Sequence, residues 1–181
     1  MKLKIFTFLI IAIFGIASQA QEIEWMSMNE ALDAQKENPK SIFMDAYTSW
    51  CGPCKMLDSN TFSNKDLAQY VNKHFYAVKF NAEGPEEIEY KDRVFKNPKY
   101  DAERSGRNST HEFASAMRIS GYPTMVFFDQ KGEMIAPVVG YRTPEQLEIF
   151  LKLFAGDEYK KFTSQEDFTE YRENFKGEFT N

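Results

Sequence analysis

The alternation of hydrophobic and polar positions along the chain predicts a mixture of strands and helices. Short apolar runs predict buried strands at 41–47 and 75–81, and two more, at 124–128 and 134–139, flank the hairpin signal Asp129-Gln130-Lys131-Gly132. Apolar residues at helical spacing predict helices at 25–38, from Cys51 onward, at 66–73, at 109–117, from Thr143 onward and at about 164–175. This order of elements predicts an α/β fold with a central mixed sheet flanked by helices.

Capping residues place the starts of three of these helices. Ser27 with Glu30, and Ser109 with Glu112, stand at the spacing of a capping box. The last core helix is predicted to start at Thr143-Pro144. Its apolar face carries Leu147, Phe150, Leu151 and Phe154. The helix after Cys51 is expected to carry Met56, Leu57 and Phe62.

Residues 83–108 are the least regular part of the chain. Many charges and several turn-forming pairs predict a loop here, with one helical turn around 86–91. Those pairs are Gly84-Pro85, Asn97-Pro98 and Ser105-Gly106. Residues 155–181 add a C-terminal tail whose helix has one aromatic side, which we expect to pack on the preceding domain. That side carries Phe168, Tyr171 and Phe175.

The first twenty residues have the pattern of a secretory signal peptide. Lys2 and Lys4 precede an uncharged run over 5–17, and Ser18-Gln19-Ala20 offers small residues at the two positions that a signal peptidase recognises. We expect cleavage near Ala20 and a periplasmic or secreted mature protein. An uncleaved membrane anchor is the alternative, but the apolar run is shorter than the roughly 20 residues that span a bilayer.

Length and composition indicate one globular domain. The chain has 181 residues, of which 43% are hydrophobic, enough for one well-packed core but too few for two ordinary domains. The net charge is −5 and there is no run of Lys and Arg, so nucleic-acid binding has little support.

Cys51 and Cys54 are the only cysteines in the chain. Two thiols three positions apart can form and break one bond with each other, which predicts a thiol–disulfide oxidoreductase. A disulfide across so short a loop would restrain the unfolded chain little, so it would be a poor structural staple. Half of a zinc site is the other alternative, but only His74 and His111 could complete it and neither has the usual spacing. We therefore expect no metal and no other cofactor.

A helix that begins at Cys51 would give the two thiols different roles. Free backbone N–H groups and the positive end of the helix dipole stabilise a thiolate at Cys51, which would make it the attacking nucleophile. Cys54, one turn inside the helix, would be the buried thiol that resolves the mixed disulfide. Pro53 suits the first turn of a helix, and Gly52 would let a client backbone approach.

The segment Trp50-Cys51-Gly52-Pro53-Cys54-Lys55 resembles the active-site motif of thioredoxins. The chain is similar to that family from about 41 to 154, interrupted by the loop at 83–108. The resemblance implies the thioredoxin fold, organised as a signal peptide at 1–20, a thioredoxin-like domain at 21–154 with an insertion at about 83–108, and a helical extension at 155–181.

The same resemblance implies a buried charge pair beneath the motif. Asp45, six residues before Cys51, matches a family aspartate that takes the proton of the resolving thiol, and Lys79 matches the lysine beside it. Burial should raise the pKa of Asp45, and Lys79 should lower it again. Taken singly, the two residues could equally be a strand-end aspartate and a lysine that keeps its ammonium in water.

Gly121-Tyr122-Pro123-Thr124 resembles the family's cis-proline loop. A cis bond before Pro123 would put the backbone of Tyr122 against the cysteines, where it could pair with an extended client strand. An ordinary trans turn is the alternative. Trp50 would shield the sulfurs and Gly140 matches a glycine of the substrate-facing rim, although both could be packing and turn residues. Tyr47 stands where thioredoxins usually have a tryptophan.

The resemblance implies an exported protein that reduces or exchanges disulfides in client proteins. Gly52-Pro53 between the cysteines is similar to the dipeptide of reducing members. We expect disulfide-containing clients, a monomer, and a membrane electron donor, since nothing in this chain could supply the electrons. Two alternatives remain: a periplasmic oxidase or isomerase, and a binding or chaperone module in which the thiols are incidental.

Overall fold

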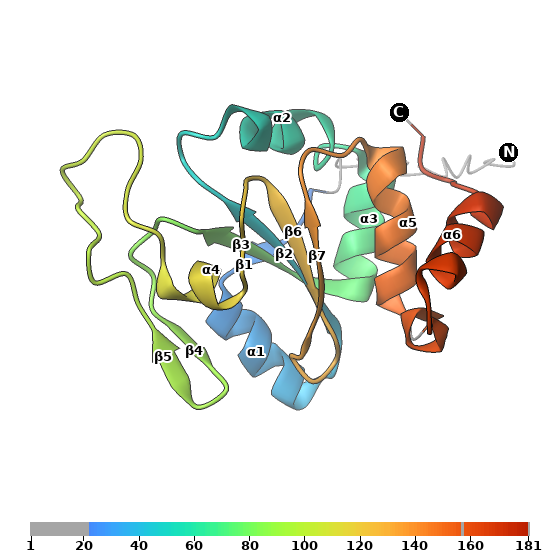
Figure 1. Ribbon diagram of the computed structural model, residues 1–181, viewed down its shortest axis with the longest axis horizontal. Coiled ribbons are helices and arrows are strands. Elements are labelled where there is room, and N and C mark those ends of the chain that lie inside the picture. Colours follow the sequence, from blue (N-terminus) through green and yellow to red (C-terminus); the bar gives the residue numbers. More distant parts are fainter. Residues whose placement is uncertain (1–21, 157, 181) are drawn as a thin grey trace, which may run out of the picture.

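A five-stranded mixed sheet forms the centre of the protein. The computed structural model describes residues 22–156 and 158–180, and the predicted signal peptide lies outside them. The strands lie in the order β1-β3-β2-β6-β7, and helices cover both faces of the sheet (Figure 1). The strands are β1 (Trp25–Met26), β2 (Ser41–Tyr47), β3 (Phe75–Asn81), β6 (Thr124–Phe128) and β7 (Met134–Val139).

Strands β1, β3 and β2 are parallel, whereas β6 and β7 run antiparallel to their neighbours. The helices are α1 (Met28–Glu37), α2 (Gly52–Asn60), α3 (Lys65–His74), α4 (Glu112–Ala116), α5 (Pro144–Ala155) and α6 (Gln165–Asn174), with a 3₁₀ turn, η1, at Glu158–Lys161. This is the thioredoxin fold that the sequence predicted, with the predicted bounds of the four longer strands.

Alternation along β2 and β3 divides the interior into two cores. Phe43 and Phe75 face one side, where they pack with Leu57 of α2 and with the apolar faces of α3 and α5. Met44 and Val78 face the other side, toward α1 and α4. Because successive side chains of a strand point to opposite faces, Asp45 and Lys79 lie on the side of α2.

The two outer strands of the sheet are short or interrupted. At one edge, β1 pairs only two residues with β3, Trp25 with Ala77 and Met26 with Val78. At the other edge, β7 contains Pro137 and pairs with β6 through a register shift at Phe127/Phe128.

The first helix is shorter than predicted. The sequence pattern placed a helix over 25–38, but Trp25 and Met26 extend along β3 and α1 begins at Met28. The predicted capping box is confirmed, since Ser27 accepts a hydrogen bond from the Glu30 backbone and the Glu30 carboxylate accepts one from the Ser27 backbone. Phe62 likewise lies beyond the end of α2.

The helical turn predicted around 86–91 is wrong. Residues 88–95 form a hairpin of β4 (Ile88–Tyr90) and β5 (Arg93–Phe95), which Figure 1 shows beside α1 and α4. Lys91 and Asp92 form its turn with φ of 51° and 58°. Two successive positive φ values match the twist of paired strands. Ile88 and Tyr90 are buried against the core beneath α4 and so hold the hairpin in place.

Helix α4 begins two residues later than the predicted capping box. His111 is its N-cap, with Nδ1 accepting from the Phe113 backbone at 3.0 Å. Ser109 instead donates to the side chain of Asn97 at 2.6 Å. The imidazole of His111 is buried and its Nε2 lies 2.6 Å from the Glu86 carbonyl, so this histidine joins the insertion to α4.

The end of the tail is anchored by a buried carboxylate. Glu148 of α5 is fully buried and accepts hydrogen bonds from the backbones of Glu178 and Phe179, at 2.7 and 3.0 Å. Lys152 lies 2.8 Å from the same carboxylate. Farther along, Asp66 accepts from the backbone and hydroxyl of Thr180. The aromatic side chains of α6 also contact the core, through Phe168 and Tyr171.

Candidate active site

Cys51 and Cys54 form a disulfide at the N-terminus of α2, with their Cα atoms 5.3 Å apart. Cys51 is the N-cap of the helix, and its Sγ accepts a hydrogen bond from the Cys54 backbone at 3.1 Å. Pro53 lies in the first turn, where a missing N–H costs no helical hydrogen bond. After reduction, the same N–H and the helix dipole would stabilise a thiolate at Cys51.

Both cysteines are largely covered in this disulfide form, with 2% of each residue exposed. The expected contrast between an accessible Cys51 and a buried Cys54 therefore stays a prediction for the reduced protein. The ring of Trp50, the neighbour of Cys51, stands edge-on to Tyr122, with 6.2 Å between ring centroids. Gly52 and Pro53, between the cysteines, remain exposed.

The loop before β6 has the expected conformation. The peptide bond between Tyr122 and Pro123 is cis. The backbone N–H of Gly140 donates to the Pro123 carbonyl at 2.8 Å, so Gly140 lies against this loop. Gly140 has a φ of 92°, which L side chains rarely adopt. Since Ala46 pairs with Thr124, the loop and the disulfide share one end of the sheet.

Asp45 and Lys79 form an ion pair on neighbouring strands, opposite each other in the β2–β3 register. The Lys79 ammonium lies 2.8 Å from the Asp45 carboxylate, which is fully buried. Apart from this ammonium, neither Asp45 oxygen has a hydrogen-bond donor among the described residues. Lys79 also donates to Asp58 of α2, and its ammonium lies over three aromatic rings. Those rings belong to Trp25, Tyr47 and Phe62.

Burial dominates the acidity of Asp45. Burial raises the pKa of Asp45 to about 6. The nearby charge of Lys79 lowers this pKa, and the charge of Asp58 raises it slightly further. The effects of burial and of Lys79 on the pKa of Asp45 both have the direction predicted from the sequence. Burial would lower the pKa of Lys79, but Asp45 and Asp58 outweigh it, so the pKa of Lys79 is raised and the ammonium stays charged. Asp45 can therefore exchange a proton near neutral pH.

The insertion reaches the active site through Glu83. One oxygen of Glu83 accepts hydrogen bonds from the Trp50 indole at 2.8 Å and from the Asn108 backbone at 2.7 Å. The guanidinium of Arg107 lies over the Trp50 ring, 4.3 Å from its centroid. Residues 101–108, here called the arm, thus border the cysteine motif.

Sequence reasoning missed Glu83, Arg107 and Asp58. Asp58 follows Cys54 by four residues, so helical spacing could have placed it near the motif. Glu83 and Arg107 lie in a segment without periodicity, and no local pattern relates them to Trp50.

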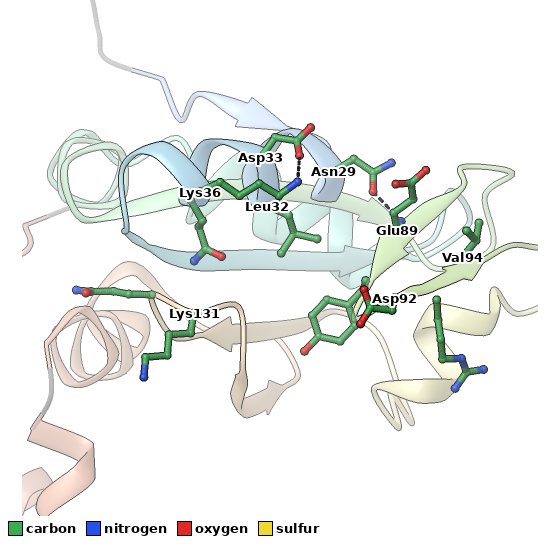
Figure 2. Close-up of a pocket in the computed structure, with 12 residues that line it drawn as sticks. Asn29, Leu32, Asp33, Lys36, Glu89, Asp92, Val94 and Lys131 are labelled. Atoms are coloured by element: carbon green, nitrogen blue, oxygen red, sulfur yellow. Dashed lines mark hydrogen bonds and ion pairs between the residues drawn. The ribbon is translucent and has the colours of Figure 1, made fainter.

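A groove lies at the other end of the sheet. It has a volume of about 820 Å³ and is bordered by α1, the β4–β5 hairpin and the turn between β6 and β7. Figure 2 shows the ion pair of Asp33 with Lys36 and the hydrogen bond from the Glu89 backbone to Asn29 at its wall. Since the groove adjoins the Phe128 end of β6 and the cysteines adjoin the Thr124 end, it is separate from the disulfide.

Two further features concern only residues 22–156 and 158–180. Within these ranges, no three His, Cys, Asp or Glu side chains are arranged to hold a metal ion. No helix there has the length and apolar character needed to cross a membrane.

Comparison with known proteins agrees with this geometry. The sequence profile of the thioredoxin-like domain matches residues 28–155, which include the cysteine motif, Asp45, Lys79 and the cis-proline loop. The chain belongs to the thioredoxin-like family. A solved thioredoxin from Thermus thermophilus shares the fold, with a TM-score of 0.57 at 16% identity over 76% of this chain and 90% of that one.

Two curated relatives of this thioredoxin-like protein carry names that describe disulfide chemistry. The thiol:disulfide interchange protein DsbD of Pectobacterium atrosepticum is 24% identical over 130 residues, which are 71% of this chain and 18% of DsbD. The disulfide bond reductase DsbH of Chlamydia pneumoniae is 23% identical over 118 residues, which are 65% of this chain and 63% of DsbH. The chain thus spans less than two thirds of either relative.

Proposed function

We propose that this protein is an exported thiol–disulfide oxidoreductase that reduces or exchanges disulfides in client proteins. The observation that carries the proposal is the Cys51–Cys54 disulfide at a helix N-terminus, on the same side of the sheet as the buried Asp45. The names of DsbD and DsbH support disulfide chemistry, and the name of DsbH supports the reducing direction.

The proposed reaction begins with the reduced protein. The Cys51 thiolate attacks one sulfur of a client disulfide, forms a mixed disulfide and releases the other client sulfur as a thiolate. Cys54 then gives its proton to Asp45, directly or through water, and attacks the Cys51 sulfur. The second client sulfur leaves as a thiolate and Cys51–Cys54 becomes the disulfide, so each turnover transfers two electrons. The client becomes a dithiol by taking up two protons, one derived from Cys54 by way of Asp45 and one from solvent.

The remaining residues would position the client. The cis bond at Pro123 leaves the Tyr122 backbone available to an extended client strand, with Trp50 and Gly140 on the rim. The predicted signal peptide at 1–20 supports export. The domain would comprise residues 21–154 and the tail residues 155–181, in a monomer. A new turnover requires a dithiol donor, which for an exported protein we propose to be a membrane protein.

The redox potential tests the direction of the reaction. Equilibrate the mature protein with glutathione buffers and follow Trp50 fluorescence. We expect about −270 mV, the reducing end of the scale. Gly52 and Pro53 themselves put no charge or side-chain donor beside Cys51, so the helix terminus and Lys55 are expected to stabilise its thiolate. A potential above roughly −180 mV would reject the reductase and favour an oxidase or isomerase.

Chemical labelling tests the roles of the thiols. Limiting iodoacetamide at neutral pH should label Cys51 of the reduced protein before Cys54. Insulin reduction should occur with the natural protein and stop with Cys51→Ser. Preferential labelling of Cys54 would reverse the roles, and no reduction by the natural protein would favour a binding module.

A further inference from the structure

The arm at 101–108 places a cation beside the cysteine motif. The Arg107 guanidinium lies over the ring of Trp50, the residue next to Cys51. Arg107 is exposed, and no carboxylate among the described residues forms an ion pair with it. A guanidinium has five N–H donors, and a contact with one ring does not occupy all of them. Since Arg107 is exposed, it therefore offers donors to a molecule that approaches the disulfide.

The position of this cation is fixed by the structure of the arm. Asn108, the next residue, donates its backbone N–H to the buried Glu83, which also holds the Trp50 indole. The Asn108 side chain bridges to the Asp101 backbone, accepting at 3.1 Å and donating at 2.7 Å. Ordering the guanidinium before a client arrives reduces the entropy that binding would otherwise cost.

A client at the cis-proline loop would pass close to this cation. The ring of Trp50 contacts Tyr122 edge-on, and the guanidinium of Arg107 lies over the same ring. The proposed client strand lies along the Tyr122 backbone, so its residues beside the attacked cysteine come near the guanidinium. A carboxylate there would meet planar N–H donors of matching geometry, whereas an ammonium would meet a like charge.

We propose that Arg107 is a specificity-determining residue that selects clients with an acidic side chain next to the attacked disulfide. This inference rests on the proposed reduction of client disulfides. It gives the insertion a definite role, because the segment that lengthens the domain also supplies the selecting charge.

Model peptides with one internal disulfide and blocked ends test the selection. Three peptides carry Glu, Gln or Lys on both sides of the cysteines, and kcat/KM for their reduction is measured at low ionic strength. The natural protein should prefer the Glu peptide over the Lys peptide by about threefold to fivefold, the range of an exposed ion pair. Arg107→Gln should bring this ratio to about 1, and Arg107→Glu should invert it.

Arg104→Gln is the matched control, because Arg104 is an exposed arginine of the same arm without a ring contact in the described structure. It should keep the preference of the natural protein. Equal rates for the three peptides, or an unchanged ratio in Arg107→Glu, would overturn the inference and leave the proposed function intact. No reduction of any peptide or of insulin would instead overturn the proposed function and, with it, this inference.

Discussion

The Lys79 ammonium lies 2.8 Å from the Asp45 carboxylate and also donates a hydrogen bond to Asp58, so two carboxylates share one cation. Asp45 is fully buried, and the only cation beside it among the described residues is shared with Asp58. Such a carboxylate is costly to ionise, and its pKa rises to about 6. Asp45 therefore lowers the stability of the protein at neutral pH, and it can accept a proton in the same pH range.

Asp45→Asn should make the protein more stable at neutral pH. Folding raises the pKa of Asp45 from 3.8 to about 6, so its contribution to stability is full below pH 3.8 and is lost as the pH rises through about 6. The variant removes this loss and should be about 1–3 kcal/mol more stable near pH 7.5, with little difference near pH 3.5. Urea unfolding at both pH values measures this, and a less stable variant at the higher pH would contradict it. The exposed Asp33→Asn is the control.

The same variant should slow the chemistry. Asparagine keeps the shape of Asp45 but cannot accept a proton, so resolution of the mixed disulfide by Cys54 should be the step that suffers. Turnover of insulin should fall most over roughly pH 6–8, where a carboxyl group of raised pKa titrates. Unchanged turnover across this range would show that Asp45 has only a structural role.

Asp58→Asn should shift the pH profile of turnover to lower pH. The charge of Asp58 raises the pKa of Asp45, and Asp58 also pairs with Lys79, the cation that lowers it. Without the charge of Asp58, Lys79 pairs with Asp45 alone, and both changes lower the pKa of Asp45. The acidic limb of the pH–rate profile reports this shift, with Asp33→Asn again as control. An unmoved limb would mean that Asp58 does not act on Asp45.

The sequence predicted the features that local patterns determine and missed those that depend on distant contacts. Strands 41–47 and 75–81 were predicted to the residue because buried strands are short apolar runs with clear ends. The β4–β5 hairpin was missed because Lys91 and Asp92 form its turn, where Gly or Asn would have signalled it. Ser109 was the wrong helix cap because Asn97, twelve residues away, takes its hydroxyl.

The candidate site shows the same division. Cys51 and Cys54 follow from a motif and its spacing, whereas Asp45, Lys79 and Pro123 were implied by the resemblance to thioredoxins. The Glu83–Trp50 bond and the Arg107 contact depend on how the insertion folds, and no local rule describes that. The upward shift of the Asp45 pKa was predictable from burial. The sharing of Lys79 between two carboxylates was not, because it depends on how α2 packs on the sheet.

Glu83→Ala should release the arm. It removes the acceptor of both the Trp50 indole and the Asn108 backbone, at a cost of about 1–3 kcal/mol. Limited trypsin digestion should then cut faster after Arg104 and Arg107 than in the natural protein. Glu83→Gln keeps one carbonyl oxygen and is the matched control, with slower cleavage than the alanine variant. Equal cleavage in all three proteins would show that Glu83 does not hold the arm.

Glu148→Gln should weaken attachment of the tail. The carboxylate accepts from two backbone N–H groups, and an amide must turn its own N–H₂ toward one of them or toward Lys152. We expect a loss of about 1–3 kcal/mol in urea unfolding and faster hydrogen exchange at residues 178–180. Glu173→Gln, an exposed change on α6, should alter neither. Unchanged exchange in Glu148→Gln would contradict the anchoring role.

The outer strands of the sheet bear on self-association. A row of unpaired backbone groups along a sheet edge can pair with another chain and begin an aggregate. Here Pro137 interrupts the row of donors in β7, and the register shift at Phe127/Phe128 distorts the ladder next to it. At the opposite edge, β1 offers only two residues for pairing. Neither edge is a long, regular template, so the sheet offers little for edge-to-edge pairing with another chain.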